Sequence, residues 1–120
     1  MAKKTLVIGA STDPSRYSYL AANKLVSHKH DIELLGVKEG IIAGKEIKTE
    51  KENFEDIDTV TLYVNPKRQE EYFDYVADLK PRRVIFNPGT ENPEFQHFLT
   101  EKGIEPIEAC TLVMLSTGQY

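Results

Sequence analysis

The chain has 120 residues, of which 40% are hydrophobic and 28% charged, a balance typical of a folded globular chain rather than a disordered one. Its formal net charge is −4 and no run of basic residues is longer than two, so the electrostatic pattern of a duplex-binding protein is missing. We therefore expect one domain over residues 1–120 and no nucleic-acid partner.

The cysteine content and the short apolar runs indicate the cellular compartment of the protein. Cys110 is the sole cysteine, so the chain offers no internal disulfide, no CxxC redox pair and no zinc half-site, and we expect no metal. The apolar run that follows Lys3 and Lys4 is too short for a signal peptide or a membrane span. These features predict a cytoplasmic protein with no membrane partner.

The first half of the chain predicts a strand, a helix and two further strands. Residues 5–10 form an apolar, β-branched run typical of a strand buried on both faces. From Ser18 onward, small and apolar residues recur with a helical period and predict an inner face made of Ala21, Ala22, Leu25 and Val26. Residues 31–37 predict a second strand, residues 40–47 a weaker one between two glycines, and the charged residues 48–56 a loop.

The second half repeats the alternation of strand and helix. Residues 58–64 and 83–86 predict strands, and an Asn-Pro pair follows soon after each of them. Asn65 and Asn92 are expected to cap the two helices that begin there, with proline in the first helical position. Residues 104–109 predict an edge strand because they contain a proline, which cannot donate to a β-ladder.

This order of elements predicts an α/β fold. We expect a Rossmann-like, doubly wound, mainly parallel sheet of about five to six strands with helices on both faces. Ligands of such sheets bind at the carboxyl ends of the strands, so the loops after the strands are the functional candidates. The partly apolar tail, residues 111–120, is expected to pack against its own domain.

The loop after the first strand has residues that suit an anion. Gly9 permits close approach of a ligand to the backbone, Ser11 and Thr12 add hydroxyl donors, and Arg16 offers a bidentate clamp for phosphate. An ordinary turn between a strand and a helix uses the same residue types. The loop alone therefore leaves a phosphate site and a plain turn equally open.

The end of the second predicted strand differs from a typical NAD site. Dinucleotide-binding proteins carry three glycines in the first loop and an acidic residue about 20 residues later, for the ribose hydroxyls. Here the second and third glycines are missing, and Lys38 precedes Glu39 at the strand end. A cation there favours a ligand with an additional phosphate on its ribose, although a solvated loop lysine is the simpler alternative.

Two later loops reach the same edge of the predicted sheet. Tyr63, Val64 and Asn65 follow one strand, and the segment Pro88, Gly89, Thr90 and Glu91 follows the next. Asn-Pro pairs form turns and helix caps without any ligand, so capping is their first expected role. Capping and ligand contact are compatible.

Five segments in fixed order carry a resemblance to a known family: "VIGAST…RYSYLAANKL", "IELLGV", "DTVTLYVNP", "RVIFNPGTENPE" and "ACTL". The set, which spans residues 4–111, resembles small single-domain CoA-binding proteins related to the CoA-binding domain of the succinyl-CoA synthetase α subunit. The resemblance implies a Rossmann-like fold that binds coenzyme A, with the nucleotide end at the loop after the first strand.

The resemblance also implies roles for single residues. Four positions would meet the phosphates: Gly9, Ala10, Ser11 and Thr12. Lys38 would meet the ribose-phosphate end of the ligand. The wall for the adenine or pantetheine would be formed by Tyr63, Val64 and Asn65. The far side of the site would be formed by Gly89, Thr90 and Glu91.

Cys110 lies at the end of the last predicted strand, on the same rim as these loops. A thiol at that place is able to form a mixed disulfide with the thiol of coenzyme A. The simpler interpretation, which we favour, is a small buried hydrophobic residue.

The sequence predicts binding rather than catalysis. The synthetase subunit continues into a second domain with a phosphorylated histidine, and His28, His30 and His97 match no active-site position of the family. We expect a non-catalytic module for coenzyme A or acyl-CoA that serves as carrier, sensor or thiol-protecting protein. An NAD(P)-binding oxidoreductase or nucleotide-sensing domain is the first alternative, and a structural domain that binds an unknown protein partner is the second.

Overall fold

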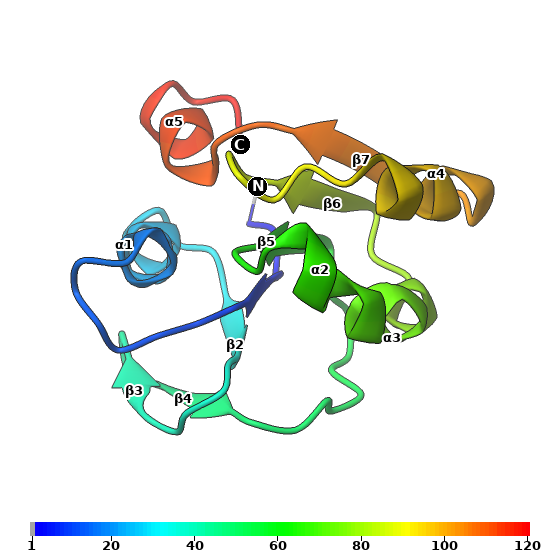
Figure 1. Cartoon of the computed structure of the whole chain (residues 1–120). Coiled ribbons are helices and arrows are strands. Elements are labelled where there is room, and N and C mark those ends of the chain that lie inside the picture. Colours follow the sequence, from blue (N-terminus) through cyan, green and yellow to red (C-terminus); the bar gives the residue numbers. More distant parts are fainter. Residues whose placement is uncertain (1) are drawn as a thin grey trace.

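A seven-stranded sheet forms the centre of the computed structural model, which describes residues 2–120 (Figure 1). Its strand order is β3-β4-β2-β1-β5-β6-β7, and every neighbouring pair is parallel except β3 and β4. The strands are β1 (Thr5–Ile8), β2 (Ile32–Leu35), β3 (Ile41–Ile42), β4 (Lys45–Lys48), β5 (Thr59–Leu62), β6 (Arg83–Phe86) and β7 (Glu105–Glu108). This topology confirms the predicted Rossmann-like fold, with β7 at one edge.

The segment predicted as one weak strand over residues 40–47 is instead a hairpin of β3 and β4, so that prediction was wrong. Ala43 and Gly44 both have positive φ angles, 51° and 80°. Two consecutive positive φ angles are typical of the two-residue turn that joins antiparallel strands. The hairpin has two strands where one was predicted, which brings the sheet to seven strands.

Helices cover both faces of the sheet (Figure 1). One face carries α1 (Tyr17–Ser27) and α5 (Thr111–Ser116). The other carries α2 (Pro66–Gln69), the 3-10 turn η1 (Glu70–Tyr72), α3 (Phe73–Leu79) and α4 (Pro93–Glu101). Within residues 2–120, none of these helices has the length and apolar character that crossing a membrane requires.

The inner stripe of α1 agrees with the prediction except at its last position, Val26. Ala21, Ala22 and Leu25 are fully buried as expected, but Val26 is 39% exposed. Ser18, where the predicted helical period begins, is also buried, because positions 18, 21, 22 and 25 follow the spacing of a single helix face. The tail packs beside α1 as expected, and Leu115 of α5 joins the core formed by Val7 and Leu25.

The two predicted asparagine caps are present. Asn65 accepts a hydrogen bond from the backbone N–H of Arg68 at 3.1 Å. Asn92 accepts one from the N–H of Phe95 at 3.2 Å and also donates from its side chain to Gln69 Oε1 at 3.0 Å. Asn92 is buried and Asn65 is exposed, so the two caps should differ in their contribution to stability.

We expect Asn92→Ala to lower the free energy of unfolding by about 1–3 kcal/mol, because it removes a cap and leaves the Gln69 side chain short of a partner. Urea unfolding of the variant checks this. Asn65→Ala is the matched control and should cost about 1 kcal/mol or less, since water replaces the lost bond at an exposed cap. Equal losses in the free energy of unfolding for the two variants would contradict the expected difference between the buried and the exposed cap.

Candidate functional site

A cavity of about 390 Å³ lies where β2, β1 and β5 end. Its volume falls within the range of about 300–1,000 Å³ that is typical of small-molecule sites. The cavity gathers most of the sequence-predicted residues: Gly9, Ala10, Ser11, Thr12, Arg16, Lys38, Tyr63 and Val64. It also includes residues that the sequence did not indicate: Asp13, Gly36, Val37, Arg68 and Tyr72.

The loop after β1 turns sharply over the strand ends. Gly9 has a φ of +95°, and a Cβ atom there would lie 2.8 Å from the carbonyl oxygen of Tyr63, so this position requires glycine. The N–H groups of Gly9 and Ala10 both donate to the carbonyl oxygen of Leu35, at 2.9 and 3.0 Å. These bonds fix the loop against the end of β2.

The next two amides of this loop are available to a ligand. Within residues 2–120, the backbone N–H groups of Ser11 and Thr12 have no hydrogen-bond acceptor. Arg16 then occupies the N-cap position of α1 without a side-chain cap, and the first turn of the helix has no acidic residue. Free amides beside an uncapped helix start form an environment that favours an anion.

The loop after β2 packs tightly against the loop after β1. A Cβ atom on Gly36 would lie 2.4 Å from the carbonyl oxygen of Ala10, and one on Gly40 would lie 2.4 Å from the Thr12 methyl group. The loop carries Lys38 on the cavity wall, and the Lys38 side chain is exposed and forms no ion pair with any of residues 2–120. Its ammonium group is therefore available to a ligand.

The third wall comes from the chain after β5. Tyr63 and Val64 line the cavity directly, whereas Asn65 is exposed outside it and serves as the cap of α2. Arg68 and Tyr72 complete this wall from α2 and η1. Sequence reasoning did not indicate Arg68, because a charged stretch after a helix start is typical of a solvated helix face.

The cavity is electropositive in a chain that is negative overall. Arg16, Lys38 and Arg68 line it, against the carboxylate of Asp13 alone. Hydrogen bonds from the Ser15 backbone and hydroxyl, at 3.0 and 2.7 Å, hold the pKa of Asp13 below its usual value, so this carboxylate stays charged. It lies 3.9 Å from the Arg16 guanidinium in an exposed pair, which is weak in water. The two other cations remain unpaired within the described residues.

The remaining predicted site residues lie outside the cavity. Pro88 and Gly89 are exposed at the end of β6, and the Gly89 N–H donates to the Glu91 carboxylate at 2.9 Å. Thr90 is buried, and its carbonyl oxygen accepts a hydrogen bond from Gln69 at 2.7 Å. Cys110 is half-buried at the N-cap position of α5. The structure does not bring these residues together with the cations.

Tyr63 lines the cavity and also packs against the core formed by Val7 and Leu115. Its hydroxyl is buried and has no hydrogen-bond partner among residues 2–120. Burial, opposed in part by the nearby hydroxyls of Thr61 and Thr111, raises the pKa of the Tyr63 phenol to about 12. The Tyr63 phenol is therefore uncharged at neutral pH.

We expect Tyr63→Phe to leave the free energy of unfolding at pH 7 unchanged or to raise it by up to about 1 kcal/mol, because the buried hydroxyl has no partner to lose. The raised pKa gives stability that is complete below the unfolded-state value of about 10 and is lost as the pH rises toward 12. Chemical unfolding between about pH 10 and pH 12 should therefore show a smaller loss in the free energy of unfolding for Tyr63→Phe than for the wild type. A large destabilisation of Tyr63→Phe at pH 7 would contradict this prediction, because it would mean that the Tyr63 hydroxyl makes a stabilising hydrogen bond.

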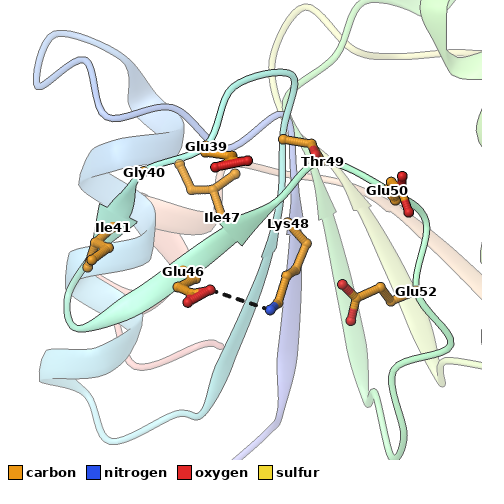
Figure 2. A pocket seen from close by; sticks show the side chains of 9 residues that line it. All are labelled: Glu39, Gly40, Ile41, Glu46, Ile47, Lys48, Thr49, Glu50 and Glu52. Atoms are coloured by element: carbon orange, nitrogen blue, oxygen red, sulfur yellow. Dashed lines mark ion pairs between the residues drawn. The ribbon is translucent and has the colours of Figure 1, made fainter.

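A second hollow lies along the hairpin and has the opposite charge (Figure 2). Its volume is about 610 Å³, and four carboxylates surround it, those of Glu39, Glu46, Glu50 and Glu52. Lys48 is the single cation there and pairs with Glu46 at 3.6 Å. This hollow repels phosphates, and no group of three or more metal-binding side chains suited to a metal ion occurs within residues 2–120.

Comparison with known proteins assigns the family. Residues 3–116 match the family described as CoA binding domain, and the chain belongs to this family. The search of curated proteins found no match. The match to the CoA binding domain family confirms the resemblance that the sequence motifs indicated.

Solved structures with the same fold were also found. The crystal structure of an uncharacterized protein is 52% identical, with a TM-score of 0.98, and the alignment covers 100% of this chain and 99% of that one. Cell-free ID.343 from Thermus thermophilus is 24% identical, with a TM-score of 0.86 and coverage of 99% and 91%. A hypothetical protein from Pyrococcus horikoshii OT3 is also 24% identical, with a TM-score of 0.88 and coverage of 97% and 83%. The last two similarities establish the fold alone.

Proposed function

We propose that the chain is one CoA-binding domain whose cavity after β2, β1 and β5 holds the nucleotide end of coenzyme A or of an acyl-CoA. The observation that carries the proposal is the pair of free amides at Ser11 and Thr12, beside the uncapped start of α1 and Arg16, in a chain of the CoA binding domain family. Backbone amides at a helix start are a recurrent solution for binding a pyrophosphate.

Each wall of the cavity then has a role. The amides of Ser11 and Thr12 bind the pyrophosphate and Arg16 neutralises its charge. Lys38 meets the ribose-phosphate end, and Tyr63 offers its ring to the adenine or to the start of the pantetheine arm. The rest of the arm runs outward across the strand ends, toward the residues of the later loops that lie outside the cavity.

We further propose that the module binds its ligand without transforming it. The titratable residues that line the cavity are arginine, lysine, tyrosine and Asp13, with no histidine or cysteine among them. The Asp13 carboxylate is already hydrogen-bonded and its pKa is lowered, and the Tyr63 phenol has a raised pKa. Neither group is matched to proton transfer near neutral pH, which fits carriage, sensing or thiol protection better than catalysis.

Calorimetric titration of the protein with coenzyme A, NADH and NADPH tests this proposal. We expect coenzyme A to bind with a dissociation constant on the order of 1 μM, and each nicotinamide cofactor to bind at least about tenfold more weakly. A preference for NADH or NADPH would support the oxidoreductase alternative. Absence of binding to all three would overturn the proposed function and favour a domain that binds a protein partner.

A further inference from the structure

The three cationic side chains of the cavity come from three different segments of the chain. Arg16 belongs to the loop that supplies the free amides, whereas Lys38 and Arg68 come from the two walls on either side of it. Since β1 lies between β2 and β5 in the sheet, the loops after those two strands flank the β1 loop. Val37 and Tyr72 also line one adjoining hollow, so these walls approach each other beyond the cavity.

We propose that Arg68 and Lys38 together bind the 3′-phosphate of the ligand, so that the site selects 3′-phosphorylated adenine nucleotides, and that Arg68 is a specificity-determining residue. This inference rests on the proposed function and extends it to a residue that the sequence did not indicate. A phosphate monoester carries a charge of about −1.5 to −2 near pH 7, which two cations from opposite walls match.

The backbone holds Arg68 in a defined place. Its N–H donates both to the side-chain oxygen and to the carbonyl oxygen of Asn65, each at 3.1 Å. The Asn65 cap therefore fixes the start of α2 and with it the direction in which Arg68 leaves the helix. Lys67, its neighbour on α2, does not line the cavity.

No carboxylate neutralises this pair of cations. Within residues 2–120, neither Arg68 nor Lys38 forms an ion pair. Glu39 follows Lys38 directly, but it lines the acidic hollow (Figure 2) and not the cavity. Two unpaired cations on one cavity repel each other, and a dianion between them removes that repulsion.

Titration of the wild type with coenzyme A and with dephospho-coenzyme A, which lacks the 3′-phosphate, tests the inference. We expect coenzyme A to bind at least about tenfold more tightly, since a charge-assisted hydrogen bond is lost with the phosphate. The ratio of the two affinities should fall as salt is added. Equal affinities would overturn this inference and leave the proposed function standing, whereas failure of both ligands to bind would overturn the proposed function itself.

The variants assign the effect to Arg68. Arg68→Gln should lose about tenfold in affinity for coenzyme A and less than about twofold for dephospho-coenzyme A. Lys67→Gln removes the same charge from the same helix and should change neither affinity. Arg68→Lys, which keeps the charge without the bidentate geometry, should recover part of the loss. An equal loss for both ligands in Arg68→Gln would place Arg68 at the pyrophosphate and overturn the inference.

Discussion

Replacing Ser11 with glutamate should weaken the binding of coenzyme A by about 100-fold or more, while the fold remains intact. Ser11 lines the cavity, and its own N–H and that of Thr12 are free within the described residues. A carboxylate at this position competes for those amides and repels the pyrophosphate. A loss of about 2.7 kcal/mol in binding free energy corresponds to this fold-change. Calorimetric titration measures it directly.

The control for this prediction is Thr100→Glu, which adds the same charge on the exposed surface of α4, outside the cavity. We expect this variant to bind coenzyme A as the wild type does, because solvent and salt screen a distant surface charge. The thermal unfolding midpoint of both variants should stay close to that of the wild type. Retention of full affinity in Ser11→Glu would show that the ligand does not use the loop after β1.

The second large effect is expected at Gly36. A methyl group there would lie 2.4 Å from the carbonyl oxygen of Ala10, and the neighbouring backbone is fixed: the N–H of Gly36 donates to Lys48, and that of Ala10 donates to Leu35. Such overpacking costs about 1–3 kcal/mol. We expect Gly36→Ala to lower the free energy of unfolding by that amount. It should also weaken coenzyme A binding, because the relaxation moves the segment that carries the free amides.

Gly44→Ala separates the two effects of that substitution. Gly44 lies in the hairpin turn with a φ of +80° and has open space around its missing side chain. Alanine there should cost about 1 kcal/mol in stability through backbone strain, but it should leave the affinity for coenzyme A unchanged. If Gly36→Ala also leaves the affinity unchanged, the contact between the loops after β1 and β2 does not position the binding amides.

Local chemistry predicted most of the fold. Apolar runs and helical periods indicated the parallel strands and helices, and the Asn-Pro pairs indicated both helix starts. The hairpin was missed because Ala43 takes a positive φ that alanine rarely adopts, so its sequence gives little sign of a turn. Val26 was misassigned because a helical period alone does not show how far the buried face extends toward the end of the helix.

The candidate site was predictable where one loop carries its own chemistry and less so where distant segments meet. The loop from Gly9 to Arg16 contains a glycine, hydroxyls and a cation in a strand-to-helix turn. Gly36 lines the cavity because of its contact with Ala10, which lies 26 positions earlier, and Arg68 because α2 begins beside the cavity. The residues next to Gly36 and Arg68 in the sequence do not indicate that these two positions line the cavity.

The rule that ligands bind at strand ends does not say which strand ends form the cavity. It included Gly89 and Cys110 because both follow strands of the same sheet. The cavity lies instead where the chain order of the strands reverses, with β1 between β2 and β5. The sequence did not show where that reversal falls, since it depends on which strands pair.

The most direct test of the central proposal is to follow the backbone amide resonances of the isotopically labelled protein during titration with coenzyme A. We predict that the largest changes occur at Ser11 and Thr12, with further changes at Lys38 and Arg68, and that the acidic hollow around Glu46 stays unchanged. Absence of change at Ser11 and Thr12 with saturating coenzyme A, or changes confined to the acidic hollow, would contradict the proposed site.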